Sequence, residues 1–343
     1  MLNVIAQSEA PELSNLVQPL HIRHPEIFTG VLIVILGLVI GLINPAFFQL
    51  STLFDVLRSS TVLGLFALGV LIVLVSGGID VSFTAIAAFA MYSLTKLVFV
   101  VAPTAPIFFI FLVAALIGIG LGMLNGFLVH HLKAPSLIVT IGTQYLFRGL
   151  LLSFVGTVFF MNIPAPMDNF GSLNLIRLPV TSVSGKTSFT ALPAFVLFLA
   201  LASVLTWFIL NRTLVGRAIY AVGGSLQIAE RLGYNVKAIY LFVFGYSGFL
   251  AGLAGIIHVS TNRLANPFDL VGIELDVIAA VVLGGARITG GTGTVFGTLL
   301  GVVLVVLINN VLILAGVPSS WQKVFIGGFI LIAGALFASQ QKK

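Results

Sequence analysis

The chain has 343 residues, of which 59% are apolar and only 8% are charged, with 16 Lys and Arg against 10 Asp and Glu. Soluble domains average about 25% charged residues, so this composition excludes a soluble enzyme, a nucleic-acid-binding domain and a disordered chain. The net charge of +6 is better explained by basic cytoplasmic loops of a membrane protein. Cysteine is absent, which excludes disulfides and cysteine-based metal sites.

The N-terminal segment, residues 1–26, contains three glutamates and a single arginine. It lacks the basic region and the short apolar core of a cleaved signal peptide. We therefore expect a cytoplasmic segment over 1–26, a transmembrane domain over 27–338 and a cytoplasmic tail over 339–343.

Apolar runs of about 20 residues predict membrane-spanning helices. The pattern predicts an all-α integral membrane protein with about ten transmembrane helices, at 27–44, 57–76, 82–101, 107–129, 136–160, 189–210, 238–258, 274–287, 294–315 and 321–338. The eighth is the weakest because it is short and starts with Glu274 and Asp276, so nine spans or a re-entrant segment is the alternative. With the N-terminus inside, inner loops carry more Lys and Arg than outer loops, which places both termini in the cytoplasm.

Two loops between the predicted spans stand out by their length. Residues 161–188, on the outer side, contain Pro, Gly and Ser and show little helical periodicity. Residues 211–237, on the inner side, predict a short helix with Ser225 as its N-cap and Gly233 as its C-terminal stop. No phosphate-binding GxxxxGK[ST] motif occurs anywhere in the chain, so no ATPase domain is predicted.

The stretch LVSGGIDVSFTAIAAFAMY, residues 74–92, places two glycines beside Asp80. Asp80 could serve as the N-cap of the third helix. Alternatively, a carboxylate at a helix break inside a membrane could belong to a proton or substrate site.

The glycine-rich stretch VVLGGARITGGTGTVFGTLLG spans residues 281–301. No strand precedes it, which argues against a phosphate-binding loop. We expect a tight turn between helices, with close packing of backbone on backbone. The stretch weakly resembles residues 74–92, which hints at an internal repeat of the kind found in transporters.

A candidate translocation path follows the fifth predicted span. Arg148 lies inside the span, and Gln144 and Thr140 precede it by one and two helical turns, so the three share a face. Asn125 in the fourth span could join them, as could Asp80. The alternative for Arg148 is a structural role, with the guanidinium paired to a carbonyl or directed to the interface. The histidines show no ligand spacing, and we predict no catalytic residue, metal site or cofactor.

Four motifs in order resemble the membrane permease subunits of bacterial sugar ABC importers, the group for ribose, xylose, arabinose, galactose and autoinducer-2. The four motifs are GGIDVS at 77–82, APSLIVTIGT with its downstream FRG at 134–149, AVGGSLQIAERLGYNV at 221–236 and GGARITGGTGTVFGT at 284–298. The closing VPSSWQKVFIGGFILIAG is also similar. The chain departs from the usual family pattern at Val81, Thr84, Ser225 and Arg287.

The resemblance implies a non-catalytic permease of the bacterial inner membrane that works by alternating access. Two permeases, identical or paralogous, would form the pore, a periplasmic sugar-binding protein would deliver the solute, and a cytoplasmic ABC ATPase would bind ATP. The inner loop 213–237 would be the ATPase-coupling element, and the outer loop 161–188 with residues 262–272 would face the binding protein. The coupling residues are Gly216, Arg217, Gly223, Gly224, Glu230, Arg231 and Gly233. A solvated basic anchor is the alternative for the inner loop.

An ion-coupled secondary transporter of a small polar solute is the alternative function. Such transporters often keep carboxylates at the membrane midplane, whereas Asp80, Glu274 and Asp276 map near the ends of predicted helices. A channel would require a selectivity filter, and an intramembrane enzyme would require a catalytic constellation, and neither pattern is present. The sequence does not name the sugar.

Overall fold

The computed structural model describes residues 25–181, 187–314 and scattered positions between 318 and 331. Most of the predicted N-terminal segment, the tail and much of the tenth predicted span at 321–338 lie outside the described residues. The orientation of the termini therefore stays a prediction.

The described chain is a bundle of helices with one β-hairpin. Its elements are α2 (Pro25–Ile43), η2 (Pro45–Phe48), α3 (Leu50–Val75), α4 (Phe83–Val101), α5 (Ile107–Leu132), α6 (Ser136–Leu150), η3 (Leu151–Val155), α7 (Ala165–Ser172), β1 (Asn174–Thr181), β2 (Thr187–Pro193), α8 (Val196–Arg212), α9 (Leu214–Gly224), α10 (Leu226–Arg231), α11 (Val236–Asn262), α12 (Glu274–Leu283) and α13 (Val295–Leu314). Among the described residues, six helices are long and apolar enough to cross a membrane. α8 and α9, bent by 74°, make a seventh if the pair is one span. A helical membrane protein is thus confirmed, and the count of ten stays a prediction.

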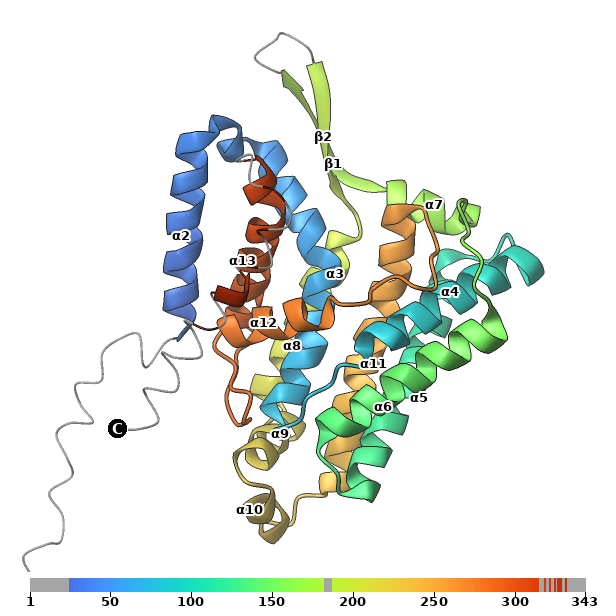
Figure 1. The fold of residues 1–343 in the computed structure, drawn as a ribbon, viewed down its shortest axis with the longest axis vertical. Helices are drawn as coiled ribbons and strands as arrows, with labels where there is room; N and C mark the ends of the chain where they lie inside the picture. Colours follow the sequence, from blue (N-terminus) through green and yellow to red (C-terminus); the bar gives the residue numbers. More distant parts are fainter. Residues whose placement is uncertain are drawn as a thin grey trace, which may run out of the picture.

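Figure 1 shows α3 running through the middle of the bundle, with the hairpin at one end of the molecule and α9 and α10 at the other. α3 contacts α8, α11, α12 and α13, and its residues 64–75 are all buried. A helix that is apolar on every side is buried on every side, which explains why this segment is central. α12 lies across the middle of the bundle rather than along it.

α5 and α11 pack with their backbones in close contact. A Cβ atom on Gly118 of α5 would overlap the carbonyl oxygen of Gly248 on α11, and the reverse substitution would overlap the carbonyl of Gly118. One helical turn on, a Cβ on Gly122 would overlap the carbonyl of Phe244. Small residues at intervals of four allow such an approach, which is a common source of helix association in membranes.

The structure corrects several predicted boundaries. The outer loop 161–188, which shows little helical periodicity in its sequence, contains helix α7 and strand β1. The span predicted at 189–210 begins in strand β2, because a short apolar run such as Phe189–Pro193 suits a strand as well as a helix. The span at 136–160 ends at Val155, where Gly156 follows with φ of 145°.

The eighth predicted span, 274–287, is the ten-residue helix α12. At 1.5 Å per residue it is about 15 Å long, half of the roughly 30 Å hydrocarbon core. This length fits the re-entrant alternative better than a full crossing.

Candidate functional site

One side of α6 carries four polar side chains at intervals of four residues: Ser136, Thr140, Gln144 and Arg148. At the start of the helix, the Ser136 hydroxyl accepts a hydrogen bond of 2.8 Å from the amide of Ile79. The Thr140 hydroxyl lies 3.2 Å from the carbonyl oxygen of Ile79. These two hydroxyls, of which only that of Thr140 belongs to the predicted stripe, therefore link α6 to the segment between α3 and α4.

The next turn of α6 contacts a buried carboxylate. The Gln144 Nε2 donates a hydrogen bond of 2.7 Å to Oε1 of Glu274, the first residue of α12. The same oxygen accepts a bond of 2.6 Å from the Thr84 hydroxyl on α4, and Oε2 accepts one of 2.7 Å from the amide of Gly272. Glu274 is only 7% exposed. Three donors therefore compensate its removal from water.

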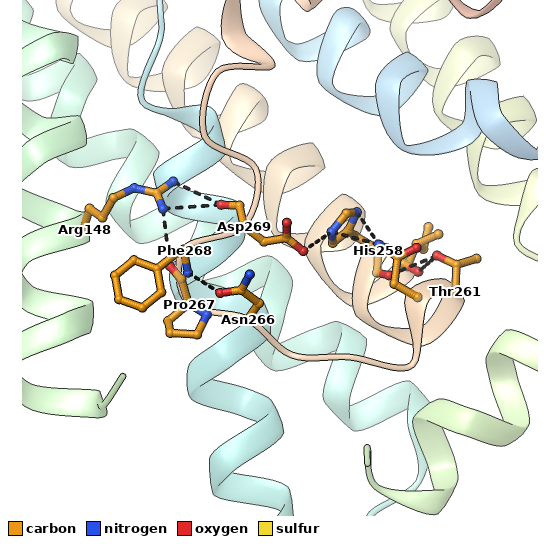
Figure 2. Close-up of polar contacts among 9 residues, drawn as sticks. Arg148, His258, Thr261, Asn266, Pro267, Phe268 and Asp269 are labelled. Carbon is orange, nitrogen blue, oxygen red and sulfur yellow. Dashed lines mark hydrogen bonds and ion pairs between the residues drawn. The ribbon is translucent and has the colours of Figure 1, made fainter. Parts of the chain in front are cut away.

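Arg148 is held by the backbone of the loop that leads into α12. Its guanidinium donates to the carbonyl oxygens of Pro267 and Asp269, each at 3.3 Å (Figure 2). The Asp269 carboxylate points the other way, where its Oδ2 accepts a bond of 2.8 Å from Nε2 of His258. This bond lowers the pKa of Asp269, so the carboxylate stays ionised at neutral pH. The structure thus gives Arg148 the carbonyl partners that the structural alternative expected.

Asp80 and Asn125 meet in a separate buried network. Oδ1 of Asp80 accepts bonds from the amide and the hydroxyl of Ser82, at 2.8 and 2.7 Å, and Oδ2 accepts one of 3.1 Å from the hydroxyl of Ser247. Nδ2 of Asn125 donates to the Ser82 hydroxyl at 2.6 Å. Ser82, not Asp80, occupies the N-cap position of α4, so the predicted cap is two residues out of place. Asp80 forms the turn before the helix instead.

The predicted path residues therefore do not form one open line in this conformation. Asp80, Asn125 and Thr140 are at most 1% exposed, whereas Gln144 and Arg148 are half-buried. Sequence reasoning missed Glu274, Thr84 and Asp269 as parts of the same polar region. The signal for Glu274 was present, as an acid opening an apolar segment too short to span.

The inner loop contains two helices. α9 is capped by the Thr213 hydroxyl, which accepts from the amide of Gly216 at 3.0 Å. α10 is capped by Ser225, which accepts from the amide of Ile228 at 3.3 Å, as predicted. Gly233 follows with φ of 84°, a left-handed conformation that suits the predicted stop.

The surface of this loop combines charge with apolar side chains. Arg217, Glu230 and Arg231 are exposed. Ile228 and Leu232 on and after α10 are 58% and 69% exposed, while Ala229 is buried against the bundle. Gly216 is required at the bend from α8 into α9, because a Cβ there would overlap the carbonyl oxygens of Ile209 and Leu210.

Comparison with known proteins gives a consistent answer. Residues 52–334 match the family described as "Branched-chain amino acid transport system / permease component". The chain is 33% identical over 302 residues to the ribose import permease protein RbsC of Haemophilus influenzae, covering 88% of this chain and 89% of that protein. It is 33% identical over 306 residues to the autoinducer 2 import system permease protein LsrC of Yersinia pestis, covering 87% and 80%. No solved structure matches the chain.

The family match over residues 52–334 includes every residue of the polar contacts described above. The matches favour an importer permease over an ion-coupled transporter. The chain therefore belongs to the family of branched-chain amino acid transport system permease components, as a non-enzymatic, multi-pass permease subunit of an ABC importer in the inner membrane.

Proposed function

We propose that the chain imports a sugar or a sugar-like small polar solute, powered by ATP hydrolysis on a separate cytoplasmic ATPase. The observation that carries this proposal is the similarity, over most of both chains, to permeases named for ribose and for autoinducer 2. A neutral polyol is recognised by hydrogen bonds and apolar contacts rather than by net charge. The half-buried Gln144 amide, hydrogen-bonded to the Glu274 carboxylate, is compatible with such a solute.

The two ends of the molecule would bind two different partners. We place the ATPase at α10, where exposed Ile228 and Leu232 can enter an apolar groove while Glu230 and Arg231 form ion pairs at its rim. The hairpin and α7 lie at the opposite end (Figure 1), where a periplasmic sugar-binding protein would deliver the solute. A second permease, a copy or a paralogue, would complete the pore.

Within the bundle, we place Gln144 and Arg148 beside the path of the solute, because they are polar and only half-buried. Glu274 would orient the Gln144 amide through their 2.7 Å bond. Asp80, Asn125 and Thr140, buried here, would maintain the shape of the neighbouring segment. In this proposal all five residues belong to the path region, and only Gln144 and Arg148 contact the solute directly.

The test is uptake by proteoliposomes containing the permease with its co-purified ATPase. The chain would be tagged and isolated from native membranes in mild detergent, and its binding protein would be screened against pentoses, hexoses and autoinducer 2. We expect uptake of labelled solute only with ATP on the ATPase side and with the loaded binding protein on the other. A hydrolysis-deficient ATPase is the control. Uptake driven by a proton or sodium gradient without ATP would contradict the proposal.

A further inference from the structure

Three glycine pairs, far apart in sequence, meet at the end of the molecule that carries α9 and α10. They are Gly77 with Gly78, Gly223 with Gly224, and Gly290 with Gly291. A Cβ on Gly223 would overlap the carbonyl oxygen of Val75 and lie 2.7 Å from the amide nitrogen of Gly291. A Cβ on Gly290 would lie 2.6 Å from Cα of Gly77 and 2.8 Å from the carbonyl oxygen of Gly223. The atoms nearest to these Cβ positions are backbone atoms, so the three segments pack backbone on backbone.

Hydrogen bonds fix this contact. The amide of Gly291 donates to the carbonyl of Val75 at 2.9 Å, which ties the turn before α13 to the end of α3. The Tyr220 hydroxyl on α9 donates to the carbonyl of Gly293 at 2.7 Å. Gly77 and Gly290 have φ of 83° and 90°, which other residues rarely adopt. Because these segments pack backbone on backbone, no flexible side chain can change rotamer to absorb a displacement of one segment. A displacement of one segment therefore shifts its neighbours.

The contact lies between the surface proposed for the ATPase and the polar side of α6. On one side, α10 begins two residues after Gly224, at Leu226. On the other, the segment that contains Gly77 continues to Ile79, which is bonded to Ser136 and Thr140 at the start of α6. A movement of α10 can therefore be transmitted to α6 through the short segment that contains Gly77 and Ile79.

We infer that Gly223 is the positioning residue through which the docked ATPase moves residues 76–82 and, through them, α6. This inference rests on the proposed docking of the ATPase at α10. Tyr220 maintains the same contact through its bond to Gly293. Gly223 does not contact the solute. It keeps the end of α9 against the two glycine turns, so that the movement of the ATPase is transmitted from α9 to residues 76–82.

The experiment compares Gly223→Ala and Tyr220→Phe with wild type in proteoliposomes that contain the full importer. The readouts are the amount of ATPase bound, the rate of ATP hydrolysis and the solute imported per ATP. We expect both variants to bind the ATPase as wild type does, while the solute imported per ATP falls by about fivefold or more for Gly223→Ala and less for Tyr220→Phe. Gly30→Ala on α2, where a Cβ meets nothing within 4 Å, is the matched control.

A purely structural role would lower the bound ATPase, hydrolysis and import together, leaving import per ATP unchanged, and that result would overturn the inference. If Gly223→Ala does not fold, Tyr220→Phe decides alone, because it removes one hydroxyl and adds no volume. Import per ATP equal to wild type in Tyr220→Phe would then refute the inference. Failure of the wild-type importer to bind an ATPase or import solute would instead refute the proposed function.

Discussion

Glu274 shows how a carboxylate is kept inside this bundle. Its donors come from residues 84, 144 and 272, so three separate segments must be in place before the charge is compensated. If one donor is lost, hydrogen bonds no longer fully compensate the free-energy cost of removing this charge from water. The contact is therefore sensitive to single substitutions on α6.

Gln144→Leu removes one of these donors while keeping an apolar side chain of similar size. We expect the free energy of unfolding to fall by about 1–3 kcal/mol, since a hydrogen bond to a buried charged group is lost. Thermal unfolding of the purified protein in detergent measures this. Tyr145→Phe is the control, because Tyr145 is the next residue on α6 and is 75% exposed. Equal melting temperatures for the two variants would show that the Gln144–Glu274 bond contributes nothing.

The sequence could predict contacts between residues close in the chain, but not contacts between distant residues. The Ser225 cap was predictable because its partner, Ile228, is three residues away. The partners of Glu274 on α4 and α6 are 190 and 130 residues away, and no local pattern encodes such a distance. Gly223 and Gly224 are adjacent glycines, and the sequence does not distinguish their roles. A Cβ atom on Gly223 would overlap the carbonyl oxygen of Val75, whereas one on Gly224 would meet nothing within 4 Å.

At the scale of elements, most long helices were predictable, although α3 begins seven residues before its predicted span at 57–76, and the irregular segments were not predictable. The predicted spans at 82–101 and 107–129 differ from α4 and α5 by at most three residues, because long apolar runs bounded by polar or proline residues leave little choice. The hairpin was missed because β2 runs almost directly into the apolar helix α8, so that the prediction joined the end of the strand to the helix. Their pairing, from Asn174 with Pro193 to Thr181 with Thr187, is a cross-strand property that a linear pattern does not show.

Helix packing gives a prediction at this scale. Gly118→Ala on α5 would force α5 and α11 apart, because the added methyl group overlaps the carbonyl of Gly248. We expect a loss of about 1–3 kcal/mol, as for overpacked cores. Gly120→Ala, two residues along the same helix, meets nothing within 4 Å and improves helix propensity.

Thermal unfolding of both variants in one detergent distinguishes these outcomes. Gly118→Ala should melt below wild type and Gly120→Ala at or above it. If the two melt together, the α5–α11 contact does not limit stability.

At the scale of the whole molecule, the two ends differ in their chemistry. The end with α10 exposes Ile228 and Leu232 beside Glu230 and Arg231, and the other end carries the hairpin (Figure 1). Sequence alone assigned these loops to opposite sides from charge and span order, and the structure places them at opposite ends. The family resemblance, rather than composition, supplied their partners.

Charge reversal tests this asymmetry. Glu230→Lys or Arg231→Glu should lower ATPase binding and transport while membrane insertion is unchanged, because only ion pairs at the docking surface are inverted. Co-purification of the ATPase and fractionation of membranes measure the two properties. Arg177→Glu on the hairpin reverses a charge at the far end and should leave ATPase binding intact. Wild-type transport by the Glu230 and Arg231 variants would remove the coupling role of the loop.

The half-length helix α12 also has a consequence for how the chain is made. A ten-residue segment that opens with Glu274 and Asp276 is too short and too acidic to enter a bilayer alone, since a charged side chain such as Asp at the centre of a membrane helix costs roughly 2.5–3.5 kcal/mol. Two of the three donors to Glu274 lie on α4 and α6, which leave the ribosome much earlier. We therefore expect α12 to take its place only after these helices have assembled, so that the order of synthesis helps to determine the final topology.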